Sequence, residues 1–316
     1  MSSAGLVALA LKAPGLFGTN LELPNMMFGL LVSGENELRA SAQEALSSLV
    51  DAYVKSSPEN ILSQLRTQLL ERATQDDYRV RLCALTLLSR LYPFDDPAVR
   101  FTCIELSSDS RQEVRQLAKY GLKVINHSNI GRTTPKSKLL LSSNNNQYKK
   151  GDPPKISTMI RYLMTKANLQ SSTTRAKSLD AVSLTHALEF IQQILIYEVE
   201  KEQKSISKNA GEKKESECDD DDDEMKVFDD ESVESLSNIP KESILQCADL
   251  VSLAIGSDVS QAGATTLLRT AASSLAKLIE LFPNTVGQRY ASKENVSRLE
   301  VKTILSYFIF MSACYH

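Results

Sequence analysis

The stretch Val80-Arg-Leu-Cys-Ala-Leu-Thr-Leu-Leu-Ser-Arg-Leu91 carries apolar residues at its first, fifth, eighth, ninth and twelfth positions. These positions follow the 3.6-residue period of an α-helix that has one apolar face. Arg81 comes directly after the first apolar position. The stretch therefore predicts a helix that buries one face and places an arginine near its N-terminal end.

Two further segments fit the same template without a gap, residues 38–49 and 114–125, with Arg39 and Arg115 in the place of Arg81. Successive arginines are 42 and 34 residues apart, which leaves room for one partner helix before each copy. A pair of helices cannot bury its own apolar face, so neighbouring pairs stack into one continuous core. The chain is therefore predicted to be all-α and to fold as a solenoid of helical hairpins.

The partner helices are expected at residues 21–32, 58–74 and 97–107. Pro58 and Pro97 stand near the starts of two of them, where the missing N–H of proline costs nothing. Asp76 and Asp109 lie five and six residues before their arginines and are predicted to cap the second helix of each hairpin. We also expect an arginine after a helix start to bind the turn carboxylate of the neighbouring repeat, as a structural ladder rather than a ligand site.

A weaker fourth copy of the template begins at Leu268-Arg269 and continues through Ala272, Leu275-Ala276 and Ile279. Further helices are expected at residues 154–168, 178–203 and 240–255. The second of these has charged last turns and is predicted to leave the core before residue 203.

Two stretches interrupt the helical pattern. Residues 128–152 carry five Lys/Arg and no acid before Asp152, which indicates a basic surface loop. Residues 204–238 are poor in apolar side chains and are predicted to be a disordered acidic insert; residues 212–234 hold 13 Asp/Glu against 3 Lys/Arg. The predicted domains are repeats at 1–127, the basic loop at 128–152, helical repeats at 153–203, the insert at 204–238, and repeats at 239–316 that look truncated.

Residues that could carry chemistry are few. His127, His186 and His316 are too far apart in the sequence to form a nucleophile–base pair or a metal triad from neighbours, and no Cys-x-x-Cys occurs. The spacing of Gly29 and Gly34 matches a phosphate loop, but Glu and Asn follow where Lys and Ser/Thr are needed. We predict no catalytic, cofactor-binding or metal-binding residue, and no enzyme activity.

The compartment follows from the cysteines and the apolar runs. The five cysteines lie at least 20 residues apart and read as free thiols of a reducing compartment. The longest uncharged apolar run, residues 307–315, is about half of what a bilayer needs. We therefore expect a cytoplasmic protein, with the nucleus as a second location, and no membrane span. Nucleic acid is not expected as a partner, because only Tyr148 is available for stacking near the basic loop.

The segment Val99-Arg-Phe-Thr-Cys103 is followed by Asp109, Glu113-Val114-Arg115, Ala118 and Gly121-Leu122. This series resembles the proteasome adaptor and scaffold family of HEAT-repeat proteins. That family has an aromatic residue and then Cys in the first helix, and an Asp–acid–Val–basic–Ala–Gly-Leu series in the second. Residues 153–168 resemble the segment that follows there, so the resemblance covers about residues 76–165.

The resemblance implies a HEAT-like solenoid that acts as a non-catalytic interaction scaffold and tethers the proteasome core particle to its regulatory particle. It implies proteasome subunits, and other proteins, as partners. Members of the family are several-fold longer than 316 residues, so it also implies that this chain is an internal or truncated piece. A HEAT/armadillo-type transport adaptor of the importin kind stays open as an alternative. Its inner groove would carry regularly spaced Asn, Trp or acidic residues, and this chain has no Trp.

Overall fold

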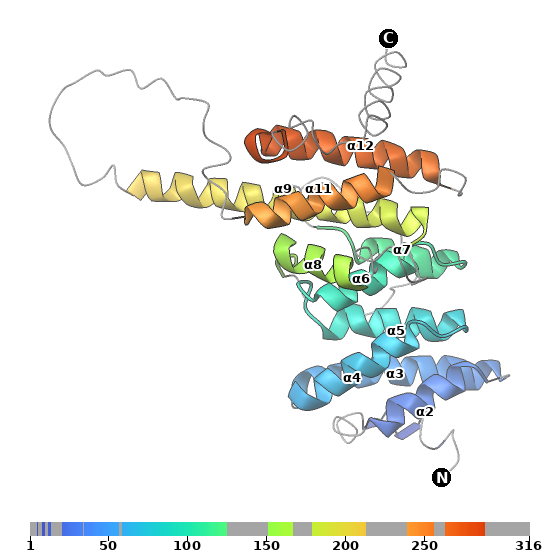
Figure 1. Ribbon diagram of the computed structural model, residues 1–316. Coiled ribbons are helices and arrows are strands. Elements are labelled where there is room, and N and C mark those ends of the chain that lie inside the picture. The colour runs from blue at the N-terminus through green and yellow to red at the C-terminus, as the bar shows by residue number, and fades with distance from the viewer. Residues whose placement is uncertain are drawn as a thin grey trace, which may run out of the picture. The chain divides into compact units, whose positions relative to one another are not determined.

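The computed structural model describes residues 5, 8–9, 12–13, 21–33, 35–56, 59–124, 151–166, 179–212, 239–255 and 263–287. All regular structure in these residues is helical, which confirms the predicted all-α fold (Figure 1). The chain forms two compact units. The first unit comprises Met1–Leu122 with Gly131–Pro153, and the second comprises Lys123–Ile130 with Pro154–His316.

The first unit is a stack of three helical hairpins, as predicted. α2 (Glu22–Leu31) pairs with α3 (Asn36–Ser56), α4 (Glu59–Arg72) with α5 (Tyr78–Leu91), and α6 (Pro97–Leu106) with α7 (Gln112–Tyr120). The second helices stack in chain order, since α3 contacts α5 and α5 contacts α7 (Figure 1). The repeating template therefore builds the contact layer between successive hairpins.

The template positions form the core of this unit. In α5 the five apolar positions, Val80, Ala84, Leu87, Leu88 and Leu91, are all buried. In α3 the positions from Ala42 to Leu49 are buried and Leu38 is half-buried, while in the third copy Val114, Ala118 and Leu122 are buried. Ile125, the last position of the third copy, lies outside the described residues. The solenoid of helical hairpins predicted from the 3.6-residue period is thereby confirmed, and it agrees with the HEAT-like fold that the family resemblance implies.

The prediction that Asp76 caps α5 was wrong, because the cap is the next residue, Asp77. The Asp77 carboxylate accepts a hydrogen bond from the backbone N–H of Arg79 at 2.8 Å, while Asp76 is exposed. α5 begins at Tyr78, and a capping side chain acts from the residue directly before the first helical one. Spacing from the arginine could not separate these two adjacent aspartates.

Asp109 stands before α7 but does not occupy its cap position. Its carboxylate accepts from the backbone N–H of Arg111 at 2.8 Å, and Arg111 is itself the N-cap residue, without a side-chain cap. The cap of α6 was not predicted. Asp96 accepts from the backbone N–H groups of Ala98 and Val99, with Pro97 at the first helical position.

The second unit contains α8 (Ile156–Lys166), α9 (Ala181–Glu212), α11 (Lys241–Ile255), α12 (Ala264–Leu281) and a short π-helix, η4 (Pro283–Gly287). α9 packs against α8, α11 and α12, and α11 packs against α12.

The predicted helices are present, but α9 is longer than predicted, so residues 204–212 are helical and do not belong to the insert. Residues 200–204, Glu-Lys-Glu-Gln-Lys, are strong helix formers and continue the helix beyond Val199. Residues 213–238 of the insert and residues 125–150, which include most of the basic loop, lie outside the described residues.

The fourth copy of the template exists in α12, but in a frame one residue earlier than predicted. The buried positions are Leu267, Ala271, Ser274, Leu275 and Leu278, whereas Ile279 is 38% exposed and Arg269 is exposed. α12 carries apolar residues at neighbouring positions in both frames, such as Leu267 and Leu268. Periodicity alone therefore could not choose the face, and packing on α9 and α11 decides it.

A carboxylate of α9 holds the start of α8. The Glu198 Oε1 atom accepts a hydrogen bond from the backbone N–H of Ile156 at 2.7 Å. Burial raises the pKa of Glu198, with the neighbouring Glu202 adding to the rise, while the Ile156 hydrogen bond and the charges of Lys155 and Lys201 act in the opposite direction. A carboxyl with a raised pKa in the folded chain holds its proton more tightly there than in the unfolded chain.

The wild-type chain is therefore expected to lose stability as the pH rises from 4.5, the ordinary pKa of a glutamate carboxyl. The Glu198→Gln variant should lose less stability over the same pH range. The glutamine keeps an oxygen for the Ile156 N–H and carries no charge to desolvate. Denaturation midpoints of wild type and variant, measured from acid to neutral pH, should diverge as pH increases. Glu280→Gln, which changes an exposed carboxylate of α12, is the control, and the same pH profile for both variants would contradict the prediction.

Candidate interaction surface

The residues that could carry chemistry do not converge in the described part of the chain. No three His, Cys, Asp or Glu side chains there are grouped so that they could hold a metal ion. His186 lies on α9 with its Nδ1 atom 3.0 Å from Glu189 Oε2, while His127 and His316 lie outside the described residues. Cys83 and Cys247 are free and buried, and burial raises the pKa of each thiol to about 12. The predicted absence of catalytic, cofactor and metal residues stays a prediction.

Among the described residues, no helix is both long enough and apolar enough to span a membrane.

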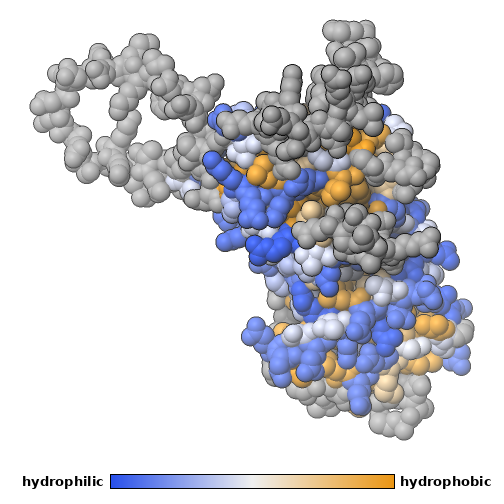
Figure 2. Space-filling model, viewed as in Figure 1, coloured by the Kyte–Doolittle hydropathy of each residue, from blue (hydrophilic) through white to orange (hydrophobic). Residues whose placement is uncertain are grey.

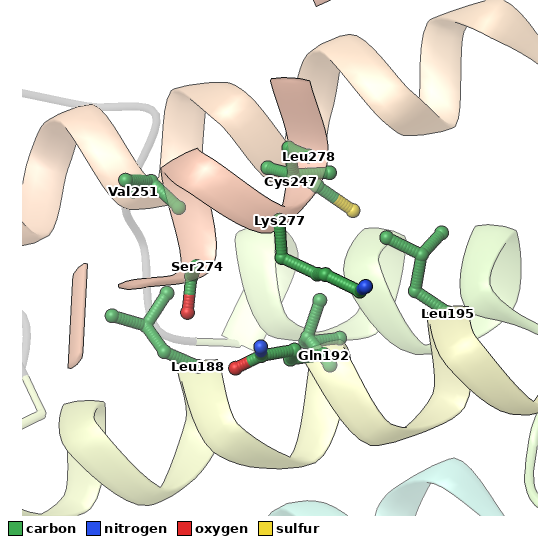
Figure 3. A pocket seen from close by; sticks show the side chains of 9 residues that line it. Leu188, Gln192, Leu195, Cys247, Val251, Ser274, Lys277 and Leu278 are labelled. Atoms are coloured by element: carbon green, nitrogen blue, oxygen red, sulfur yellow. The ribbon is translucent and has the colours of Figure 1, made fainter. Parts of the chain in front are cut away.

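A small internal space lies between α9, α11 and α12 in the second unit (Figure 3). It measures about 10 Å³, which is close to the least that one water molecule needs. Most of its lining is apolar, and the buried Ser274 hydroxyl has no hydrogen-bond partner there. Lys277 also lines it, but its ammonium donates to Glu280 Oε1 at 2.7 Å. This space is far too small for a substrate or an organic cofactor.

Each template arginine forms hydrogen bonds with backbone carbonyl oxygens in the turn of its own hairpin. The guanidinium of Arg81 donates to the carbonyl oxygens of Gln75 at 2.8 Å and of Asp76 at 2.6 Å. Arg39 and Arg115 likewise donate to the carbonyl oxygen six residues earlier. The arginine recurs in the template because a turn has carbonyl oxygens without helix partners, and a guanidinium has several donors to offer them.

Two ion pairs fix the second hairpin against the third. Arg81 of α5 forms two hydrogen bonds with Asp109, at 2.6 and 2.9 Å, and Arg66 of α4 forms two with Asp96, at 2.6 and 2.5 Å. The first pair is the predicted ladder contact. The second was missed because Arg66 lies outside the template. Arg81 belongs to the second helix of its hairpin and binds the turn before α7, whereas Arg66 belongs to the first helix and binds the N-cap of α6, so both helices of the second hairpin contact the third hairpin.

The Arg81–Asp109 pair is the more buried of the two. The side chains of Arg81 and Asp109 are 12% and 4% exposed, against 33% and 10% for Arg66 and Asp96. Burial by itself would raise the pKa of Asp109, but the hydrogen bonds from Arg81 and the Arg111 backbone outweigh it and lower that pKa. The carboxylate is therefore held in its charged form.

Beside this pair lies a partly exposed group that we name the Tyr78 cluster: the half-buried Tyr78 and Arg79 and the exposed Arg111. The guanidinium of Arg111 lies 4.6 Å from the centre of the Tyr78 ring, and that of Arg79 lies 5.5 Å from it. The Arg79 side chain is 39% exposed, and Arg111 is exposed. Tyrosine and arginine are the residue types enriched among those that dominate binding energy in protein interfaces. The Tyr78 cluster is thus a candidate protein-binding surface on α5 and α7.

Apolar side chains do not provide a comparable surface within the described residues. Figure 2 shows hydrophilic residues over much of the visible surface, with hydrophobic ones scattered among them. The most exposed large apolar residues are Met26 and Val32 at α2 and its C-cap, and the others, such as Tyr120, Leu253 and Ile279, each come from a different helix. Scattered exposed apolar residues are ordinary on a protein surface. We therefore base the candidate surface on the arginines and the tyrosine.

The residues that carry the family resemblance are mainly core residues. Every side chain from Val99 to Cys103 is buried, including Arg100, which is 2% exposed. The Arg100 guanidinium donates to the carbonyl oxygen of Gly121 and lies 4.5 Å from the centre of the Phe94 ring. A Cβ atom at Gly121 would lie only 2.8 Å from the Cys103 sulfur. The residues of this motif therefore pack α6 against the end of α7, and they do not indicate where a partner binds.

Gly121→Ala is accordingly expected to destabilise the first unit by about 1–3 kcal/mol, because the new methyl group overlaps a sulfur atom in a packed core. Cys103→Ala removes that sulfur and should restore part of the loss when both changes are combined. Denaturation of the two single variants and the double variant checks this. Additive effects of the two changes would show that the sulfur is not what requires glycine.

Comparison with known proteins shows what parts of this chain are similar to. Residues 5–105 match the family described as Proteasome component ECM29, N-terminal. The human Proteasome adapter and scaffold protein ECM29 is 26% identical over 136 residues, which cover 42% of this chain and 7% of that protein. The family match starts well before residue 76, where the resemblance noted in the sequence begins, and overlaps it from residue 76 to residue 105. Residues 5–105 are therefore similar to the N-terminal part of this proteasome component family, and the chain spans only a small part of the length of the human relative.

Proposed function

We propose that the chain is a non-catalytic scaffold module that associates with the proteasome and tethers its core particle to its regulatory particle. The observation that carries this proposal is the match of residues 5–105 to the N-terminal family of a proteasome component. The relative's printed name, adapter and scaffold protein, describes a binding role. We extend that role to this chain, with the cytoplasm and the nucleus as its locations.

The first unit is suited to a scaffold role because ion pairs hold its second and third hairpins together. The Arg81–Asp109 and Arg66–Asp96 pairs link both helices of the second hairpin to the third hairpin. A solenoid held in this way presents its exposed side chains at fixed spacing, so a partner can bind without the cost of ordering the surface. In the proposal, the Tyr78 cluster contributes binding energy to the partner contact.

The test is binding of the purified chain to immobilised proteasome core particle, regulatory particle and the assembled complex. We expect binding to the core and regulatory particles, and more assembled complex when the chain is added. Arg111→Ala should weaken binding by at least about tenfold, as for an interface residue of large effect. Gln43→Ala, which changes an exposed residue of α3, is the control and should bind as wild type does. No binding of the folded wild-type chain to any of the three particles would refute the proposal.

A further inference from the structure

Arg81 and Arg115 are held by their own turns in the same way. In each residue the Nη1 atom donates to the backbone carbonyl oxygens five and six residues earlier. Because two carbonyl oxygens hold one corner of the guanidinium, the opposite edge, formed by Nε and Nη2, has a fixed direction. The two arginines are therefore the same structural element in successive copies of the template.

The Nε/Nη2 edge of Arg81 binds a carboxylate. Its two atoms donate to the two carboxylate oxygens of Asp109 at 2.6 and 2.9 Å. Two parallel hydrogen bonds of this kind are the geometry in which a guanidinium binds a carboxylate with the greatest specificity. The second copy of the template thus shows what the edge of a template arginine can bind.

The same edge of Arg115 has no partner within the described residues. Both printed contacts of its half-buried side chain use Nη1, and it forms no ion pair there. The Asp109 carboxylate is already bound by Arg81. Glu113 is exposed, but two residues along a helix rotate a side chain by about 200°, so it lies on another side of α7.

The sequence of the first unit does not supply a carboxylate at the corresponding place. Asp109 follows Arg81 by 28 residues, whereas the residue 28 positions after Arg115 is Ser143. No Asp or Glu occurs from residue 114 to residue 151. Asp152 is therefore the one acid that the first unit contributes after α7.

That aspartate lies near the other end of α7. Its neighbour Gly151 lies against Phe94, and the Phe94 ring is 4.5 Å from the guanidinium of Arg100. Arg100 donates to the carbonyl oxygen of Gly121, which follows the last residue of α7. The Arg115 guanidinium is bound instead to the turn before the first residue of the helix. A carboxylate for its edge therefore has to come from outside the first unit.

We propose that the Nε/Nη2 edge of Arg115 binds a side-chain carboxylate of a partner protein, as Arg81 binds Asp109. Arg111 favours such a partner, because it is exposed, precedes Arg115 by one helical turn and forms no ion pair within the described residues. Two cations one turn apart match a partner segment that carries more than one acid. As a contact to the proteasome this site rests on the proposed function, but its chemistry is tested below without any proteasome.

The experiment follows the guanidinium N–H signals of the full chain by NMR while a blocked peptide of three glutamates is added. The Nε–H signal of Arg115 should move and reach saturation. The signal of Arg81 should stay in place, because Asp109 already binds its edge. A blocked peptide of three glutamines has the same length without carboxylates and should move neither signal.

A matched pair of variants separates the two-donor edge from the charge. Arg115→Lys keeps the charge and removes the edge, so the dissociation constant of the glutamate peptide should rise at least about fivefold. Arg269→Lys makes the same chemical change at an exposed residue of α12 and should leave the dissociation constant unchanged.

Two results would overturn the proposal. An Arg115 signal that stays constant in the wild-type chain would show that the edge does not take a carboxylate, and this measurement does not depend on how any variant folds. Equal dissociation constants for Arg115→Lys and Arg269→Lys would show that charge alone attracts the peptide. A saturating Arg115 signal together with no binding to proteasome particles would refute the proposed function and leave this site in place.

Discussion

Leu88→Ala is expected to lower the free energy of unfolding of the first unit by about 2–5 kcal/mol. Leu88 is fully buried at a template position of α5, the helix that stacks between α3 and α7. Removing three carbon atoms there loses their burial and leaves a cavity that two layers of neighbouring helices cannot fill by a local shift. The loss should affect the stacking of the hairpins on both sides of α5.

Chemical denaturation measures this effect, with Gln116→Ala on α7 as the control. Gln116 is exposed, and its truncation should change stability by no more than about 0.5 kcal/mol. Hydrogen exchange separates the two units, because α3, α5 and α7 should lose protection while α9 and α12 keep theirs. If Leu88→Ala and Gln116→Ala had the same midpoint, the buried template would not be the core of this unit.

Arg81→Ala is expected to cost about 3 kcal/mol, because it leaves the Asp109 carboxylate, 4% exposed, without its charged partner. Arg66→Ala removes the same kind of two-bond contact from Asp96 at a more exposed site and should cost less. Double-mutant cycles with Asp109→Ala and Asp96→Ala isolate the two pair energies. A larger coupling energy for the Arg66–Asp96 pair would show that burial does not determine the strength of these contacts.

The Arg81–Asp109 contribution should also depend on pH in a defined direction. The pKa of Asp109 is lower in the folded chain than its ordinary value of 3.8, so the unfolded chain binds the proton more tightly. The stabilisation is present above that ordinary value and is lost as pH falls through the lowered one. The difference in stability between wild type and Asp109→Asn should therefore shrink in acid. A constant difference across that pH range would rule out this linkage.

The local periodicity of the apolar residues was sufficient to predict the helices and their pairing into hairpins. The positions from Val80 to Leu91 follow a 3.6-residue period, and a helix with such a face has to bury it against other helices. The helices α2, α4 and α6 were predicted for the same reason, because each copy of the template needs a partner helix before it to form a hairpin. Most residues that carry the family resemblance lie in the core, among them Val99, Cys103 and Ala118.

The pattern of apolar residues could not decide structural features that change with a shift of one residue. Asp76 and Asp77 are both acceptable caps by composition, and the actual start of α5 at Tyr78 selects Asp77. α12 can present either Leu267 or Leu268 to the core, and contact with α9 and α11 selects Leu267. A helical wheel turns by about 100° per residue, so two adjacent apolar stripes remain equivalent until a neighbouring helix covers one of them.

The amino-acid sequence by itself determined the all-α hairpin stack, its core positions and the arginine that recurs in each copy, because these follow from spacing within a single helix. Only the tertiary structure decided which distant side chains meet: Arg66 with Asp96, Arg111 with Tyr78, and Cys103 with Gly121. Such contacts depend on the angle and offset at which hairpins stack. Those quantities are set by the packing of all the side chains between two helices together, so no single spacing in the sequence encodes them.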